Sequence, residues 1–125
     1  MPQLNASCPH FLVSNLAAAL DYYVEVLGFE RPPLWGEPPG FAMPTRDNYV
    51  VMLNQADGLS PRPNGEGIWD AYFWCDDADA LHAELTSRNA VIEYAPLDRP
   101  LYGMREFAVR DTDGHVLAFG SDKDL

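Results

Sequence analysis

One order of secondary-structure signals runs through the first half of the chain. Residues 6–13 have the apolar, β-rich character of a strand. Asn15 suits the N-cap of a helix, because apolar residues follow it at helical spacing until Gly28. Short β-rich segments separated by turn residues follow at 31–35, 40–47 and 48–55. This half therefore predicts the order βαβββ.

The same order returns after residue 66. An aromatic strand at 67–75 precedes a helix that Asp76 or Asp77 caps, and further strands are predicted at 90–95, 102–111 and 114–122. When Val13 is aligned with Cys75, Asn15 falls opposite Asp77, at an offset of 62 residues (75 minus 13). One motif is thus used twice, and the sequence predicts an α+β fold of two tandem βαβββ modules.

The length of the chain limits how these modules are organised. At 125 residues it can bury one core but not two independent ones. We therefore expect a single domain over residues 1–125, with a first module at about 6–55 and a second at about 67–121. Residues 56–66 are dense in Gly, Pro and polar side chains, which predicts an exposed connector.

Acidic residues dominate the charge. Asp and Glu total 19 against 8 for Lys and Arg, giving a formal net charge of −11. Such a field repels nucleic acids and anionic membranes and attracts cationic solutes, although solubility alone also accounts for an acidic excess. The sequence has neither a membrane-length apolar run nor a signal peptide, so we expect a cytoplasmic protein. Cys8 and Cys75 are predicted to be buried free thiols.

Two motifs give this repeat a family likeness. The first helix ends in YYVEVLGF (22–29), and the last hairpin reads RDTDGHVLAF (110–119). They resemble the FYxxxLGF and DPDGxxxEL motifs of the vicinal oxygen chelate superfamily, which includes glyoxalases, extradiol dioxygenases, and fosfomycin and bleomycin resistance proteins. The resemblance extends from about Ser7 to Ser121. It implies that the modules form a cupped mixed β-sheet with helices on the outer face and a site on the concave side.

The resemblance also suggests where a metal ion would bind. Metal-dependent members use one residue on the first and one on the last strand of each module, and these positions carry over to Cys8, Met52, Asp70 and Ala118. Only Asp70 suits a hard divalent cation, because the others offer a soft thiolate, a thioether or a methyl group. The chain thus resembles the metal-free, bleomycin-resistance-like branch, and we expect no metal and no other cofactor.

Strand alternation adds further side chains to the concave face. On strand 102–111, Phe107 and Val109 are expected to face the helix instead. Such an aromatic and apolar set with a few acids is typical of a small-molecule pocket. The predicted ligand-binding residues are His10, Trp35, Phe41, Met52, Asp70, Tyr72, Trp74, Met104 and Glu106.

Several of these residues also have purely structural interpretations. His10 suits an exposed or satisfied histidine, and Tyr72 and Trp74 suit a core or a subunit interface. Trp35 and Phe41 flank the GEPPG loop, which either closes over a ligand or forms a stiff hairpin.

The acidic residues leave similar alternatives. Asp70 lies either at an exposed rim or is held for a cationic group. Glu106 is close in sequence to Arg105 and Arg110 and suits a surface ion pair. The segment 111–114, DTDG, is predicted to be a turn rather than a calcium loop.

The favoured function is sequestration of a small aromatic molecule, neutral or cationic, such as an antibiotic, by a homodimer. Tyr72 and Trp74 would stack on planar rings, and Asp70 or Glu106 would pair with positive charge. The alternative is a divalent-metal-dependent lyase, isomerase or dioxygenase of the same superfamily, using a displaced set of His10, Asp70 and Glu106. No catalytic residue is assigned. An interaction module whose cup is filled by its own side chains stays open, and no nucleic acid or membrane partner is expected.

Overall fold

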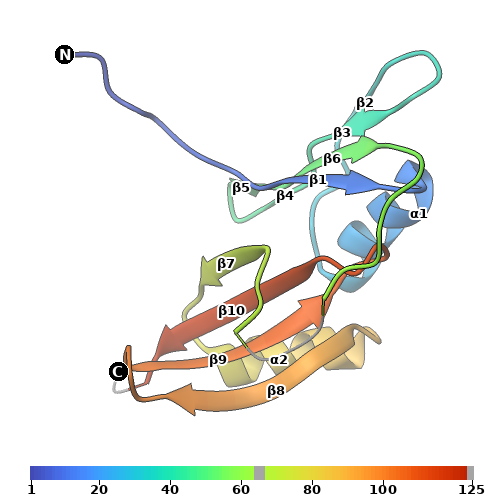
Figure 1. The fold of residues 1–125 in the computed structure, drawn as a ribbon. Helices are drawn as coiled ribbons and strands as arrows, with labels where there is room; N and C mark the ends of the chain where they lie inside the picture. Colours follow the sequence, from blue (N-terminus) through green and yellow to red (C-terminus); the bar gives the residue numbers. More distant parts are fainter. Residues whose placement is uncertain (64–66, 124–125) are drawn as a thin grey trace.

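A computed structural model describes residues 1–63 and 67–123, and Figure 1 shows the arrangement of their helices and strands. The elements of the first half are β1 (His10–Val13), α1 (Leu16–Asp21), the π-helical turn η1 (Tyr22–Val26), β2 (Leu34–Trp35), β3 (Phe41–Ala42), β4 (Thr45–Arg46), β5 (Tyr49–Val50) and β6 (Met52–Gln55). Those of the second half are β7 (Ala71–Trp74), α2 (Ala78–Ser87), β8 (Val91–Arg99), β9 (Met104–Arg110) and β10 (Val116–Asp122).

The strands of each half form a mixed sheet. The order is β1-β6-β3-β2 in the first sheet and β7-β10-β9-β8 in the second, while β4 and β5 pair with one another. In each half the first strand runs parallel to the last, β1 beside β6 and β7 beside β10. The other neighbours in these sheets are antiparallel. The two halves share this topology, and the predicted α+β class is confirmed.

The helices begin where the sequence predicts. Asn15 and Asp77 are the N-caps, and each side chain accepts a hydrogen bond of 3.0 Å from the backbone N–H three residues on. The first helix then widens into η1, where the N–H of Leu27 donates to the carbonyl of Tyr22 at 3.0 Å. Gly28 follows with φ +79°, a conformation that favours glycine, and it ends the helix.

Some predicted strand boundaries were wrong. The first strand begins at His10 rather than at residue 6, and Cys8 lies exposed before it rather than buried. The region 31–55 forms β2 to β6 instead of the predicted strands, because prolines at 32, 33, 38, 39 and 44 remove ladder donors. Of the predicted connector, residues 56–63 are irregular, and 64–66 lie outside the described residues.

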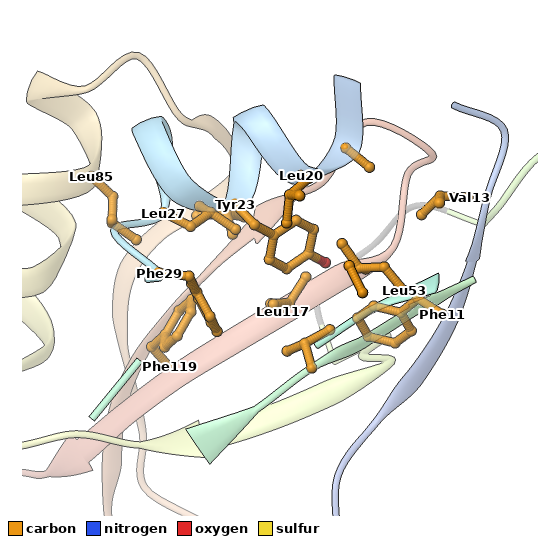
Figure 2. Packing of buried hydrophobic residues seen from close by; sticks show 14 of the residues in the cluster. Phe11, Val13, Leu20, Tyr23, Leu27, Phe29, Leu53, Leu85, Leu117 and Phe119 are labelled. Carbon is orange, nitrogen blue, oxygen red and sulfur yellow. The ribbon is translucent and has the colours of Figure 1, made fainter. Parts of the chain in front are cut away.

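One hydrophobic core joins the halves. It contains Phe11 and Leu53 from the first sheet and Leu117 and Phe119 from the second, with Leu85 of α2 at its edge (Figure 2). Burying apolar side chains of this size stabilises a fold by roughly 1.5–3 kcal/mol each. The same cluster therefore packs the helices against the sheets and the two halves against each other.

The turn at 111–114 reinforces this junction. The buried carboxylate of Asp111 accepts hydrogen bonds from the Tyr23 hydroxyl at 2.8 Å and from the N–H groups of Asp113 and His115 at 3.0 and 2.8 Å. The ring of His115 contacts the same carboxylate and stacks on Phe11, with ring centroids 4.3 Å apart. The acidic residue is thus used by the turn and by the core. No helix among the described residues is long and apolar enough to cross a membrane.

Candidate ligand-binding site

A cleft of about 860 Å³ lies between the two halves. We call it the aromatic cleft. Figure 1 shows β5 and the segment before β1 on the side of the first half that faces β7. The residues that line the aromatic cleft are Asn5, Ala6, Ser7, Cys8, Pro9, Met43, Asn48, Tyr49, Val50, Met52, Asp70, Ala71, Tyr72, Phe73 and Trp74.

Aromatic rings in and beside β7 form one wall. The ring of Tyr72 lies between Trp69 and Trp74, with centroid separations of 4.9 and 5.4 Å and edge-on geometry. Such pairs are separated as favourable aromatic contacts require. The Trp74 side chain is 77% exposed, and Tyr49 on the opposite wall is 68% exposed. The cleft therefore presents large apolar rings to whatever enters it.

Small residues on the inner face of the second sheet make room for these rings. Across the strands Tyr72 is opposite Ala118, Ala118 is opposite Ala108, and Ala108 is opposite Tyr94. Both alanines are fully buried. Ala118, at a position where the superfamily resemblance places a metal ligand, is thus part of the floor between two tyrosines.

A buried glutamate organises this face. Glu106 has no exposed surface, and its carboxylate accepts hydrogen bonds from the hydroxyls of Tyr94 and Tyr102 at 2.6 Å each and of Tyr72 at 3.1 Å. The Nε of Arg99 donates to it at 3.0 Å and balances its charge. A buried carboxylate is tolerated when it is paired and fully hydrogen-bonded, as this one is.

These contacts determine the ionisation states. Burial alone raises the pKa of Glu106, but the hydrogen bonds from the tyrosines and Arg99 outweigh burial and hold it below its usual value. Burial and the hydrogen bond to Glu106 raise the pKa of Tyr94 and of Tyr102 to about 12. Burial, followed by the charge of Glu106, also raises the pKa of Tyr72. At neutral pH the glutamate is an anion and the hydroxyls are donors.

The alternative of a surface ion pair between Glu106 and Arg105 or Arg110 is not what the structure shows. Arg105 points to the other face of β9 and binds Asp79 and Asp98, whereas Arg110 binds Glu93 and the carbonyl of Gly114. Adjacent residues of a strand project to opposite faces of the sheet, so the side chain of Arg105 points away from that of Glu106 although the two are neighbours in sequence. By the same alternation Phe107 and Val109 lie in the main core, as expected.

Asp70 and His10 are on different sides of the seam between the halves. The Asp70 carboxylate accepts from the N–H of Val116 at 2.8 Å and forms an ion pair with Arg62. His10 is exposed, contacts the Asn54 amide at 3.5 Å, and lines a second cavity of about 610 Å³ beside the connector. Asp70 lines both cavities.

The facing strands offer few donor atoms for a metal ion. In the sheets, His10 is directly opposite Met52 and Tyr72 is opposite Ala118, so of these register-matched side chains only the histidine is a good ligand. Within residues 1–63 and 67–123, no three His, Cys, Asp or Glu side chains are close enough to hold an ion together. The displaced set of His10, Asp70 and Glu106 is accordingly not brought together.

The remaining predicted residues are distributed over three places. Met52, Asp70, Tyr72 and Trp74 line the aromatic cleft. Met104 is buried near Gly120 with Tyr72, and Glu106 lies behind the same ring. Trp35 and Phe41 pair across β2 and β3 with ring centroids 5.7 Å apart, outside both cavities.

Sequence reasoning missed several members of the site. Tyr49 lies in a segment predicted as a strand, and its alternation with Val50 was the available signal. Tyr94 was within a predicted strand, but Arg99 and Tyr102 fell at or beyond strand ends, where no pattern marks a face. Their role depends on the sheet register.

Two like halves, each a mixed sheet with its helix, and a cleft between them define a paired βαβββ fold. The chain belongs to the glyoxalase/bleomycin resistance protein/dioxygenase superfamily, whose family model matches residues 8–119. The resemblance seen in the sequence is thereby confirmed. No curated protein sequence gives a significant match.

Solved structures share the fold over almost their whole length. A bleomycin-binding protein from Streptomyces verticillus, crystallised with copper(II)-bleomycin, is 24% identical with a TM-score of 0.73, covering 95% of this chain and 97% of that one. TioX from Micromonospora sp. ML1 is 22% identical with a TM-score of 0.71 and coverages of 94% and 98%. TnmS3, an antibiotic binding protein from Streptomyces sp. CB03234, is 23% identical with a TM-score of 0.70 and coverages of 97% and 99%.

Proposed function

We propose that this chain is a non-catalytic binding protein that sequesters a small planar aromatic molecule, neutral or cationic, such as an antibiotic. The observation that carries the proposal is the aromatic cleft, where Tyr72 and Trp74 face Tyr49 across a space of about 860 Å³. Pockets of this size with aromatic walls and few polar groups are typical of small-molecule sites. Met43 and Met52 add adaptable side chains that fit ligands of irregular outline.

The charge of the protein supports a preference for cations. The net charge of −11 attracts positive solutes at long range, and the faces of tyrosine and tryptophan rings attract them at short range. Asp70 on the cleft wall already has partners in Arg62 and the Val116 N–H, so its share of the attraction is small. Glu106 is shielded behind tyrosine hydroxyls and balanced by Arg99.

Sequestration in this proposal needs no metal ion and no cofactor. The support is chemical: the described His, Cys, Asp and Glu side chains do not converge in threes, and the acids nearest the cleft are occupied by hydrogen bonds. The alternative enzyme would need His10, Asp70 and Glu106 to converge, and each has different partners.

A homodimer is part of the proposal, with residues 1–125 as one functional unit of two modules. Apolar side chains remain open on the inner faces, where Leu12 is 42% and Trp74 is 77% exposed. Among the described residues β1 and β7 are edge strands of their sheets, and an edge strand offers backbone groups for pairing with another chain. A second copy would cover both features and could contribute Trp35 and Phe41 to the site. The free thiols of Cys8 and Cys75 suit the cytoplasm.

Native mass spectrometry combined with calorimetric titration tests the proposal. The probes are bleomycin, ethidium as a planar cation, and naphthalene-2-sulfonate as a planar anion, with metal analysis of the same sample. We expect a metal-free dimer that binds ethidium more tightly than the sulfonate, and a loss of about tenfold or more in affinity for Trp74→Ala.

Leu101→Ala is the matched control, because Leu101 is 94% exposed and outside the cleft. A parallel loss in Trp35→Ala would show that the β2–β3 hairpin joins the site through the partner subunit. Failure of all three probes to bind, or a stoichiometric divalent ion in the purified protein, would count against sequestration.

A further inference from the structure

Gly120 lies where a side chain would collide with the site. In the sheet it is opposite Trp74 on one side and Glu106 on the other. A Cβ at this position would contact the Tyr72 hydroxyl and lie 2.8 Å from Tyr72 Cζ, closer than real Cβ atoms approach other heavy atoms. The ring of Tyr72 therefore occupies the space that any other residue at 120 would need.

The backbone itself does not require glycine here. Gly120 is absent from the residues of positive φ, unlike Gly28 or Gly114. An alanine could adopt its conformation without backbone strain. What distinguishes Gly120 is the room that it leaves over β10.

We propose that Gly120 is a positioning residue for ligand binding, because it lets the Tyr72 ring lie across β10 and donate to Glu106. This inference rests on the proposed function of the aromatic cleft. Ala118 and Ala108, on the same face of the sheet, also have short side chains. They leave space for Tyr72 and Tyr94 to donate to Glu106 from opposite sides. The hydrogen bond to Glu106 then fixes the position of the Tyr72 ring.

The position of Tyr72 matters because its ring is the centre of the aromatic wall. It contacts Trp69 and Trp74, and Trp69 is itself tied to the same network by a hydrogen bond of 2.8 Å from its indole N–H to Tyr94. A ring held in this way loses little freedom on binding a ligand, and a preorganised site binds more tightly. Donation to an anion also makes the phenol ring more electron-rich, which favours cations over it.

Gly120→Ala tests this directly, with Gly40→Ala as the control. Gly40 has an ordinary φ, nothing lies within 4 Å of an added Cβ there, and it is not among the residues that line the aromatic cleft. With ethidium as the probe, we expect Gly120→Ala to weaken binding about tenfold or more and Gly40→Ala to change it by less than twofold. The control also removes any general effect of exchanging glycine for alanine.

A double variant separates positioning from simple misfolding. In Tyr72→Ala the ring is gone, and Met104 Cε, 3.1 Å from an added Cβ, is the end of a flexible side chain that can shift. Adding Gly120→Ala should therefore fold normally and cause no further loss of ethidium affinity. Recovery of folding in this double variant supports the inference if Gly120→Ala alone unfolds. Equal losses from Gly120→Ala with and without Tyr72, or unfolding of both variants, would overturn it.

Tyrosine absorbance at 295 nm gives a measurement without ligand. Displacing Tyr72 from Glu106 removes a cause of its raised pKa, so one tyrosine of Gly120→Ala should ionise at lower pH than in the parent. If the parent binds none of the probes, the proposed function fails, yet this titration still decides whether Gly120 positions Tyr72. If the parent binds and Gly120→Ala binds equally well, only the positioning role is refuted.

Discussion

The inner faces of the two sheets differ although the sheets share one topology. On the first, His10 and Leu12 are exposed and Met52 and Asn54 are half-buried, with few contacts among them. On the second, tyrosines cover the strands and meet at the buried Glu106. In this chain the inner face of the second sheet is thus filled by its own side chains around Glu106, and we call it the closed face, whereas the inner face of the first sheet, the open face, is not.

Removing the centre of the closed face should have the largest effect. Glu106→Ala leaves the buried Tyr94 hydroxyl, two further tyrosine hydroxyls and the Arg99 guanidinium without this acceptor, so we expect a loss of about 3–5 kcal/mol in the free energy of unfolding. His10→Ala, on the open face, should change it by less than about 0.5 kcal/mol. Urea unfolding of both variants measures the contrast, and similar values for the two would remove the distinction between the faces.

A single hydroxyl should show the same contrast on a smaller scale. Tyr94 is 8% exposed, and its hydroxyl both donates to Glu106 and accepts from Trp69. Tyr94→Phe should therefore lower the free energy of unfolding by about 1.5–3 kcal/mol. Tyr49→Phe, at a side chain that is 68% exposed, should have an effect within about 0.5 kcal/mol. If Tyr94→Phe proves neutral, the network adds no stability through this bond.

The tyrosines of the closed face should make the stability of the protein depend on pH. Folded Tyr94 and Tyr102 have pKa values of about 12, above the value of about 10 in unfolded chains. The unfolded state thus loses protons first, and stability should fall as the pH rises from about 10 towards 12. The Tyr94→Phe/Tyr102→Phe variant should lose stability less steeply over that range in thermal unfolding scans.

At acid pH the sign reverses. The pKa of Glu106 is lower in the folded state than in the unfolded one, so its contribution is present above the unfolded value of about 4.3 and is lost as the pH falls through the folded value. In Glu106→Gln the free energy of unfolding should therefore fall less steeply as the pH is lowered below about 4.3. An unchanged slope would mean that other carboxylates cause the loss of stability at acid pH.

The smallest effect on ligand binding is expected at Asp70, at the seam between the halves. Asp70→Asn removes the ion pair with the partly exposed Arg62, but the amide oxygen can still accept from the Val116 N–H. Ethidium affinity should fall by less than about fivefold. A much larger fall would mean that Asp70 binds the ligand cation itself.

Much of the fold could be predicted from local patterns. The caps Asn15 and Asp77 and the helix-facing side of Phe107 and Val109 depend on spacing within one segment, and the 62-residue repeat depends on the likeness of two such segments. The superfamily motifs added the pairing of the halves. Prediction was weaker between residues 31 and 55, where prolines cut the strands short.

The partners of Glu106 could not be predicted in this way. Along β8 the register shifts between Ile92 and Tyr94 and again between Tyr94 and Leu97. These irregularities place Tyr94 and Leu97 in the same cluster although their spacing of three would put them on opposite faces of a regular strand. A one-residue shift reverses every later assignment, so alternation alone could not bring Tyr94 to Glu106.

By itself the sequence determined the two helices with their caps, the repeat of one motif in the two halves, the superfamily and the aromatic character of β7. These follow from side-chain periodicity, capping chemistry and motifs, which act over a few neighbouring residues. Only the tertiary structure decided that Ala118 and Gly120 leave room for Tyr72, that Glu106 is buried rather than exposed, and that Arg99 balances it. Those relations join residues on different strands, and they depend on register, bulges and the space between side chains.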